Sequence, residues 1–203
     1  LLFKFPHITN EIKSRILGAT KQFQPDFQLI EIGGTIGDIE SLPFIEAIRQ
    51  FKTEIGIGNA ISIHTTLLPY LPTSGELKTK PSQHSVQDLR SYGIQPEILV
   101  CRTTKPIPKT EKEKLALFCS VPKEAVIECR DMKSIYEVPL ALEDQNMAHV
   151  VLDMLRVEDR PADLTNWKKL VENIKNPKGT VKVGIAGKYT KLSDAYISVV
   201  ESL

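Results

Sequence analysis

The sequence predicts an α/β protein built on a mainly parallel, doubly wound sheet. Short apolar runs recur at about residues 28, 61, 97, 125 and 181, and helical patterns separate the first four of them. Strands that alternate with helices in this way form a parallel sheet covered on both faces. Polar or glycine-rich segments follow the first four runs, and such folds bind ligands at the carboxyl ends of their strands. We therefore expect one binding crevice at that edge.

Composition excludes several classes of protein. The chain has 203 residues, 41% of them apolar, which is enough to bury one core with a small appendage. A net charge of +1 argues against nucleic-acid binding as the main role. The longest apolar runs are shorter than the roughly 18 residues that suggest a membrane span. Cys101, Cys119 and Cys129 lack metal-ligand spacing. We expect buried thiols and a cytoplasmic protein.

The chain is organised around residues 28–51. After a helix over residues 7–16, residues 29–32 have the pattern of a short buried strand that contains Glu31. A glycine-rich turn follows, and then Asp38 and Glu40. A buried carboxylate needs a partner, and Mg²⁺ commonly binds one or two carboxylates. These acids could therefore bind a magnesium ion or ribose hydroxyls, or they could be solvated side chains of an ordinary turn.

A helix follows this turn. Ser41 is a candidate N-cap and Pro43 falls in the first helical turn. Phe44, Ile48 and Phe51 recur at helical spacing and predict the apolar face of that helix.

The next strand is predicted over residues 60–68, because Ile61 and Ile63 alternate with polar residues. His64 lies in it, either as a catalytic group or, as we favour, as a residue that orients a loop. Beyond it, Lys80 precedes Pro81 and should be extended, which would place Lys78 and Lys80 on one side about 7 Å apart. Such a pair can clamp a polyphosphate, or it can be part of a solvated basic loop. Further donors come from Thr79, Ser82 and Gln83.

The remaining elements continue the alternation. Residues 85–92 read as a helix that ends at Gly93, and residues 98–101 as a strand. Thr110 and Glu113 have capping-box spacing before the next helix. On that helix Lys114 and Phe118 share a face, as in ordinary packing or in a nucleotide contact. Next, a strand is predicted over residues 125–129, and it leads into Arg130, Asp131 and Met132. A helix capped by Ser134 follows, and then a polar connection over 157–166 and a helix over 164–174. The chain continues with a linker over 176–180 and a strand and a helix after 181.

Several long strings closely resemble the CTP synthase family. They are EIGGTIGDIESLPFIEAIRQ, GELKTKPSQHSVQDLRSYGIQPEILVCR, LALFCSVPKEAVI, SIYEVPL and GIAGKYTKLSDAYISVVESL. The resemblance implies a fold of the phosphate-loop NTPase or dethiobiotin synthetase-like type, incomplete at the N-terminus. It implies a partial synthetase (amidoligase) domain over residues 1–157, a docking helix and linker over 158–180, and the start of a glutaminase-like domain over 181–203.

The resemblance also implies a reaction. ATP would phosphorylate the 4-oxygen of UTP, and ammonia from glutamine would displace that phosphate to give CTP, with Mg²⁺ as cofactor. CTP would inhibit as product, and glutamine and GTP would act through the glutaminase domain. Members are homotetramers whose pyrimidine nucleotide binds between subunits, so acidic and basic segments can come from different subunits.

The family assigns a ligand to each segment. Glu31 would bind Mg²⁺, and Arg130, Asp131 and Met132 would lie along the ATP base. The UTP or CTP site would contain Asp38, Ile39, Glu40, Lys78, Thr79, Lys80, Pro81, Ser82, Gln83 and Lys114.

Departures from the family pattern define the alternatives. The phosphate loop and a further metal-binding aspartate fall upstream of residue 6, and no G-x-C-x-G nucleophile elbow is present. Ser82 replaces a common threonine, and Met132 a usual β-branched residue. We expect these 203 residues alone to be inactive. A dethiobiotin synthetase-like ligase and a non-catalytic nucleotide-binding or assembly module are the competing hypotheses.

Overall fold

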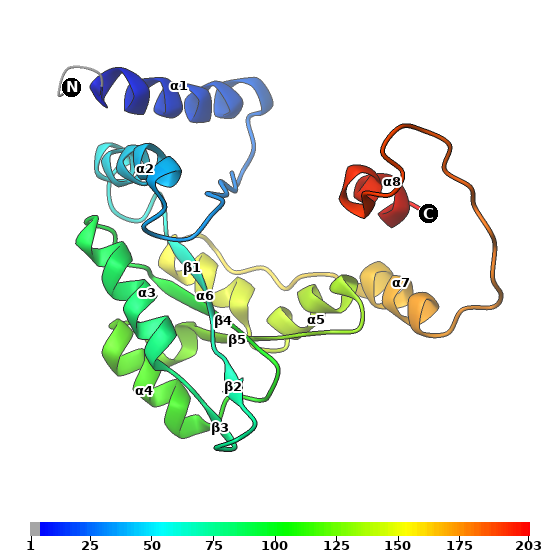
Figure 1. Cartoon of the computed structure of the whole chain (residues 1–203). Helices are drawn as coiled ribbons and strands as arrows, with labels where there is room; N and C mark the ends of the chain where they lie inside the picture. The colour runs from blue at the N-terminus through cyan, green and yellow to red at the C-terminus, as the bar shows by residue number, and fades with distance from the viewer. Residues whose placement is uncertain (1–4) are drawn as a thin grey trace. The chain divides into compact units, whose positions relative to one another are not determined.

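The computed structural model describes residues 5–203 (Figure 1). The chain divides into two compact units, one that extends to Leu164 and one over Thr165–Leu203. The predicted division at residues 157 and 180 stays a prediction. No helix in the described range combines the length and apolar character of a membrane span.

A parallel sheet forms the centre of the first unit. Its strands are β1 (Ile63–Leu67), β4 (Ile98–Thr103) and β5 (Val126–Arg130), in the order β1-β4-β5. All pairs are parallel, with Thr65 opposite Val100 and Val100 opposite Ile127. Three of the five predicted strands are thus confirmed, together with the parallel α/β class.

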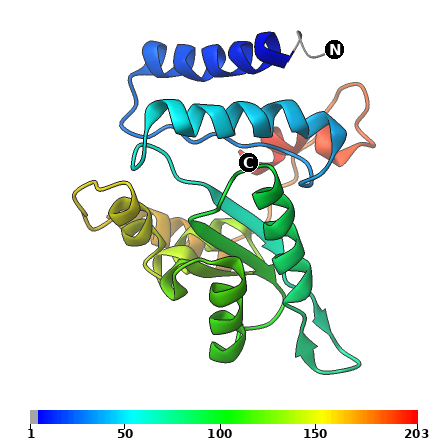
Figure 2. The ribbon, with the colours of Figure 1, turned by 90° about the vertical axis from the view of Figure 1, so that its left-hand side faces the viewer.

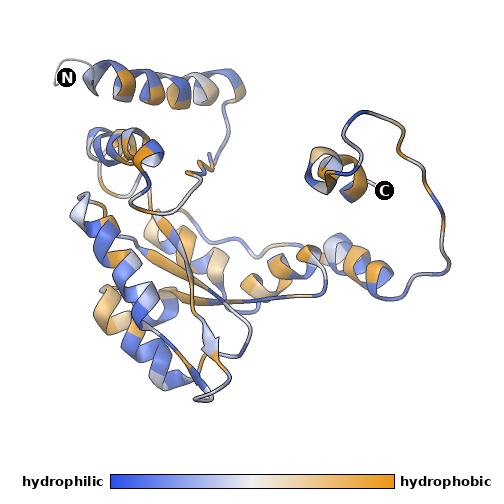
Figure 3. Cartoon of the chain, viewed as in Figure 1, coloured by the Kyte–Doolittle hydropathy of each residue, from blue (hydrophilic) through white to orange (hydrophobic). Residues whose placement is uncertain are grey.

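Helices cover both faces of this sheet (Figures 1 and 2). On one face α3 (Lys80–Ser91) and α4 (Lys109–Cys119) pack on the strands, and on the other α5 (Val138–Glu143) and α6 (Met147–Met154). Figure 3 shows the strands largely in the apolar colour. The first core includes Val86, Leu99 and Leu115, and the second includes Ile98, Ile127 and Val150.

The three cysteines are free, and two of them belong to this core. Cys101 and Cys119 are buried, as predicted, whereas Cys129 is half-buried. Burial raises the pKa of the Cys101 thiol to about 12, so this thiol stays protonated.

A helix pair precedes the sheet in sequence. The first helix, α1, runs over Phe5–Phe23, longer than the predicted residues 7–16, and packs on α2 (Leu42–Ile55). Lys13 Nζ donates to Glu54 Oε1 at 2.5 Å between them. A single turn of 3-10 helix, Ile39–Ser41, leads into α2.

The inward face of α2 differs from the prediction. Ile45 and Ala47 are buried, and Ile48 is partly buried, but Phe44 is 48% exposed. The helix begins at Leu42, so Pro43 lies in its first turn as expected. Helical periodicity identified the element, but α2 packs through a face turned by one residue.

The predicted strand over residues 29–32 is wrong. Within the described chain this segment is irregular and pairs with none of the strands, and Leu29 is 94% exposed. Glu31 is therefore exposed and not buried in a strand. Without a neighbouring strand, the backbone N–H and C=O groups of an extended segment have to hydrogen-bond to water. An apolar sequence pattern is therefore not enough to bury such a segment.

The predicted strand after residue 181 is also irregular, with Val181 84% exposed. This second unit contains α7 (Thr165–Lys175), which buries Val171, and α8 (Ile197–Glu201) after a 3-10 turn over Ser193–Tyr196. The predicted linker over 176–180 has no regular structure.

Shorter elements complete the first unit. Strands β2 (Tyr70–Leu71) and β3 (Glu76–Leu77) form an antiparallel hairpin, and 3-10 turns lie at Lys123–Ala125 and Ile135–Glu137. The predicted capping box is absent from α4, because the helix begins one residue before Thr110 and Pro108 precedes it. Ser134 does cap its turn by accepting a hydrogen bond from the Tyr136 N–H.

Candidate functional site

Parallel pairing brings three strand ends to one edge of the sheet. β1 ends at Leu67, β4 at Thr103 and β5 at Arg130, and the polar segments that follow them all leave from that edge. Across it, the Lys105 ammonium lies 5.5 Å from the centre of the Tyr70 ring, a cation–π contact between the hairpin and the loop after β4. The segments that follow β1, β4 and β5 thus share one edge of the sheet, and the expected crevice along that edge stays a prediction.

Two of the predicted nucleotide contacts meet around Glu76. Lys78 Nζ donates to Glu76 Oε2 at 2.6 Å. This hydrogen bond is the main reason why the pKa of Glu76 lies below its ordinary value, and the charges of Lys78 and then Lys114 lower it further. The hairpin and α4 therefore present two ammonium groups near one carboxylate. Phe118, on the same predicted face as Lys114, is 53% exposed.

The predicted extended run from Lys78 to Lys80 is wrong. Thr79 has helical dihedrals and α3 begins at Lys80, with Pro81 in its first turn. Proline at the start of a helix is favoured because its ring fixes a helical φ and its missing N–H needs no partner there. The preference of Pro81 for the first helical turn thus outweighs the steric effect that favours an extended conformation for the residue before a proline. Lys80 and Pro81 are exposed at the helix N-terminus, which faces the carboxyl edge of the sheet.

The neutral polar residues of this segment hold α3 on β1. Ser82 is fully buried, and its Oγ donates to the Leu67 carbonyl oxygen at 3.1 Å. Thr66 Oγ1 donates to Ser82 Oγ at 3.0 Å. Gln83 Nε2 donates to the Thr79 hydroxyl at 3.0 Å, and Thr79 is 4% exposed. The Ser82 hydroxyl therefore has a structural use, and its predicted phosphate contact stays a prediction.

His64 also joins β1 to α3. Its Nε2 lies 2.8 Å from the Ser85 hydroxyl on α3. Burial lowers the pKa of its imidazole, which favours the neutral form. The contact supports the role we favoured, in which His64 orients the neighbouring segment.

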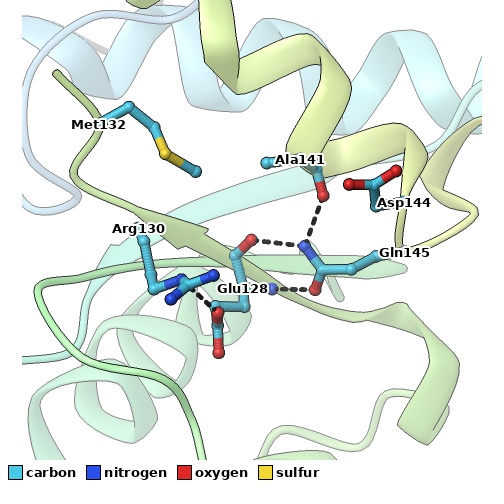
Figure 4. Close-up of a pocket in the computed structure, with 6 residues that line it drawn as sticks. All are labelled: Glu128, Arg130, Met132, Ala141, Asp144 and Gln145. Carbon is cyan, nitrogen blue, oxygen red and sulfur yellow. Dashed lines mark hydrogen bonds and ion pairs between the residues drawn. The ribbon is translucent and has the colours of Figure 1, made fainter. Parts of the chain in front are cut away.

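The segment over residues 130–132 lies beside a small pocket at the end of β5 (Figure 4). Arg130 Nε pairs with Glu128 Oε1 at 2.9 Å, and the side chains of Arg130 and Met132 line the pocket. Asp131 donates its backbone N–H to the Thr103 carbonyl oxygen at 3.0 Å, which continues the strand pairing. The pocket walls are Glu128, Arg130, Met132, Ala141, Asp144 and Gln145.

Arg102 is a residue of this edge that sequence reasoning did not include in the site. Its Nε donates to Asp131 Oδ1 at 3.0 Å, so the ends of β4 and β5 are joined by an ion pair. In the sequence, its position as a charged residue near the end of an apolar strand was the feature that could have placed Arg102 at this edge.

The acidic loop, residues 31–40, lies at the other end of α3. Ile36 packs against Ile45, Leu89 and Ile94, near the last turn of that helix. A helix from Lys80 to Leu89 spans about 14 Å at 1.5 Å per residue. The fold therefore anchors the acidic loop far from the basic N-terminus of α3.

Within the loop, Asp38 closes a local turn and its neighbours are open to solvent. Asp38 Oδ2 accepts a hydrogen bond from the Thr35 N–H at 2.8 Å. Ile39 is 83% exposed, and Glu31 and Glu40 are exposed. Among the described residues, no three His, Cys, Asp or Glu side chains gather into a metal-binding group. The carboxylate oxygens of this loop have the chemistry that Mg²⁺ prefers, and Glu31 is free to turn toward one.

Comparison with known proteins identifies a single family. Residues 3–157 match the family described as "CTP synthase N-terminus". The chain is 57% identical over 198 residues to the proteins named CTP synthase from Cyanothece sp. and Synechocystis sp.. It is 55% identical over 198 residues to the CTP synthase of Halalkalibacterium halodurans. These alignments cover 98% of this chain but 36–37% of each relative, so the chain spans about a third of their length.

Proposed function

Because this chain belongs to the CTP synthase family, we propose that it supplies nucleotide-binding parts of an enzyme that aminates UTP to CTP with ATP. The observation that carries the proposal is the match over residues 3–157, which includes every residue that we assign to the site. In the proposed reaction ATP phosphorylates the 4-oxygen of the UTP base, and ammonia derived from glutamine then displaces the phosphate. The rest of the protein supplies the glutaminase part.

The polyphosphate of UTP or CTP binds at the basic end of α3. Lys78 and Lys114 both lie near Glu76, and Lys80 is exposed in the first turn of the helix. A helix N-terminus favours an anion through its free N–H groups and its dipole. Ser82 fixes α3 on the end of β1, and Thr79, Pro81 and Gln83 shape the first turn of the helix.

The pyrimidine base and ribose bind the acidic loop of a second subunit. Asp38, Ile39 and Glu40 are anchored near the opposite end of α3 from Lys80. In a homotetramer with nucleotide sites between subunits, the acidic loop of one subunit would meet the basic segment of another. The exposure of Ile39 and Glu40 supports a role for them at such an interface.

ATP binds along residues 130–132, with its base beside the pocket at the end of β5. Arg102 and Asp131 hold the two strand ends together there. Glu31 would hold Mg²⁺, which when bound neutralises charge on the ATP phosphates. The residues of this chain position the two nucleotides, and in phosphoryl transfer positioning and charge stabilisation supply most of the catalysis.

An assay of CTP formation tests this function. We expect the protein that carries this chain, at its natural length, to convert UTP to CTP when ATP, Mg²⁺ and either glutamine or ammonia are present. Omission of ATP should abolish the product. Nucleotide binding without turnover under all these conditions would favour a non-catalytic binding or assembly module. ATP-dependent turnover of a dethiobiotin precursor, with UTP inert, would identify a ligase of the dethiobiotin synthetase type.

A further inference from the structure

The side-chain amide of Gln145 uses all of its hydrogen-bonding capacity at the outer edge of β5. Its Oε1 accepts from the Glu128 backbone N–H at 2.8 Å and from Lys112 Nζ at 3.5 Å. Its Nε2 donates to the carbonyl oxygens of Glu128 at 2.7 Å and Ala141 at 2.9 Å. An amide offers two donors and two acceptor lone pairs, so each has a partner. Figure 4 shows the three backbone contacts.

The two hydrogen bonds between the Gln145 amide and the Glu128 backbone take the place of hydrogen bonds to a neighbouring strand. β5 is the last strand of the three-stranded sheet, and among residues 5–203 its one strand partner is β4. An edge strand presents backbone donors and acceptors that lack a strand partner. The Gln145 amide supplies one acceptor and one donor to the same residue, as a paired strand would. Because Lys112 belongs to α4 and Ala141 to α5, the amide also joins the strand to helices of both layers.

Glu128 extends these contacts toward the residues assigned to ATP. Its carboxylate accepts a hydrogen bond from the Ile107 backbone N–H at 2.6 Å and pairs with Arg130 at 2.9 Å. Gln145 thus fixes the backbone of Glu128, and the Glu128 side chain fixes both Arg130 and the loop after β4. Arg130 and Met132 line the same pocket as Gln145.

We propose that Gln145 is a positioning residue for the base of ATP. It holds β5 at Glu128, so that residues 130–132 keep the conformation that receives the base. This inference rests on the proposed function. Loss of the amide loosens the end of β5 and weakens ATP binding. The basic end of α3 that receives UTP is attached to β1, and the amide reaches α4, which carries Lys114, through the long 3.5 Å contact to Lys112, so the effect on UTP is smaller.

Gln95 offers a matched control at the other end of the sheet. Its amide also makes four hydrogen bonds, at 2.6 to 3.3 Å, to Arg90 and to three backbone carbonyl oxygens. It lies just before β4 begins at Ile98, far from the carboxyl edge. Gln95→Met and Gln145→Met therefore each remove an amide that makes four hydrogen bonds. Gln95 is exposed and Gln145 is half-buried, and of the two only Gln145 lies beside the pocket.

The test compares the KM values for ATP and UTP and the melting temperatures of both variants. We expect Gln145→Met to raise the KM for ATP about tenfold, as for the loss of one or two partly buried hydrogen bonds, and to leave the KM for UTP within twofold. Gln95→Met removes a more exposed amide, so it should lower the melting temperature by no more than Gln145→Met does and should change neither KM. Absence of CTP formation in the unmodified protein would instead count against the proposed function.

A second variant keeps the test decisive if Gln145→Met does not fold. Gln145→Glu preserves side-chain length and the acceptor for Glu128, but loses the donors to two carbonyl oxygens, and should raise the KM for ATP in the same way. An unchanged KM for ATP in the folded variants would overturn the positioning role. Equal effects on ATP and UTP, or failure of both variants to fold, would likewise show that Gln145 serves only general stability.

Discussion

The Lys78 ammonium lies 2.6 Å from the Glu76 carboxylate, two residues away along the chain. A polyphosphate that binds Lys78 must compete with this internal anion, and Lys114 is near enough for its charge to act on the same carboxylate. We therefore predict that Glu76, which was absent from the predicted site, lowers the affinity of that site for the nucleotide.

Removal of Glu76 should therefore strengthen binding of the pyrimidine nucleotide. We expect Glu76→Gln to lower the KM for UTP and the inhibition constant for CTP about two- to fivefold, the scale of an exposed ion pair. Steady-state kinetics at low and high salt would measure it, with the difference smaller at high salt. Glu11→Gln removes a comparable exposed partner, from Arg15 on α1, and should change neither constant. Weaker UTP binding in Glu76→Gln would show that the carboxylate orients Lys78 productively.

Removal of the cations should have the opposite effect. Lys78→Ala or Lys80→Ala should raise the constants for UTP and CTP about tenfold or more, because a hydrogen bond to a charged group is lost. The KM for ATP should stay within a few-fold. Parallel kinetics for the three nucleotides would measure this, and an equal loss for ATP would contradict the assignment of this segment.

Glu31 is exposed in an irregular loop, so its replacement should affect metal use without unfolding the protein. We expect Glu31→Gln to raise the Mg²⁺ concentration required for half-maximal activity and to leave the melting temperature unchanged. Titration of activity with Mg²⁺ at fixed nucleotide concentrations tests it. An unchanged Mg²⁺ requirement would remove Glu31 from the metal site.

Ser82 should contribute to stability through its buried hydroxyl. Ser82→Ala leaves the Leu67 carbonyl oxygen and the Thr66 hydroxyl without this partner, which should cost about 1–3 kcal/mol of unfolding free energy. Denaturant unfolding of Ser82→Ala, Thr66→Val and the double variant measures the coupling. Because the two hydroxyls share one bond, the double variant should lose less than the sum of the single losses. Strict additivity would contradict this contact.

Glu46 gives a pH dependence whose sign follows from its partners. Hydrogen bonds from Arg49, then Gln50, lower its pKa from 4.5 to about 2. The folded state therefore binds the proton more weakly than the unfolded state, so this stabilisation is present above pH 4.5 and disappears as the pH falls toward 2. Melting temperatures across that window should fall less for Glu46→Gln than for the unmodified protein. Parallel curves would show that Glu46 does not contribute.

The sequence predicted what depends on local patterning. The strands β1, β4 and β5 and the end of α3, at Ser91 just before Gly93, follow from apolar alternation and turn chemistry that neighbouring residues carry. The polar segments after these strands meet because parallel pairing places their ends at one edge. The family strings identified the family, which the comparisons confirm, whereas the ligand of each segment stays a prediction.

Only the tertiary structure decided which segments pair and which side chains are already used. Residues 29–32 have a strand pattern but no pairing neighbour, so Glu31 lies in solvent. Lys80 begins a helix because Pro81 suits the first turn of α3. Tertiary contacts also decided which side chains have a partner: Ser82 is hydrogen-bonded to Thr66, Glu76 to Lys78 and Gln145 to Glu128. Such contacts depend on the packing of elements, which local periodicity does not encode.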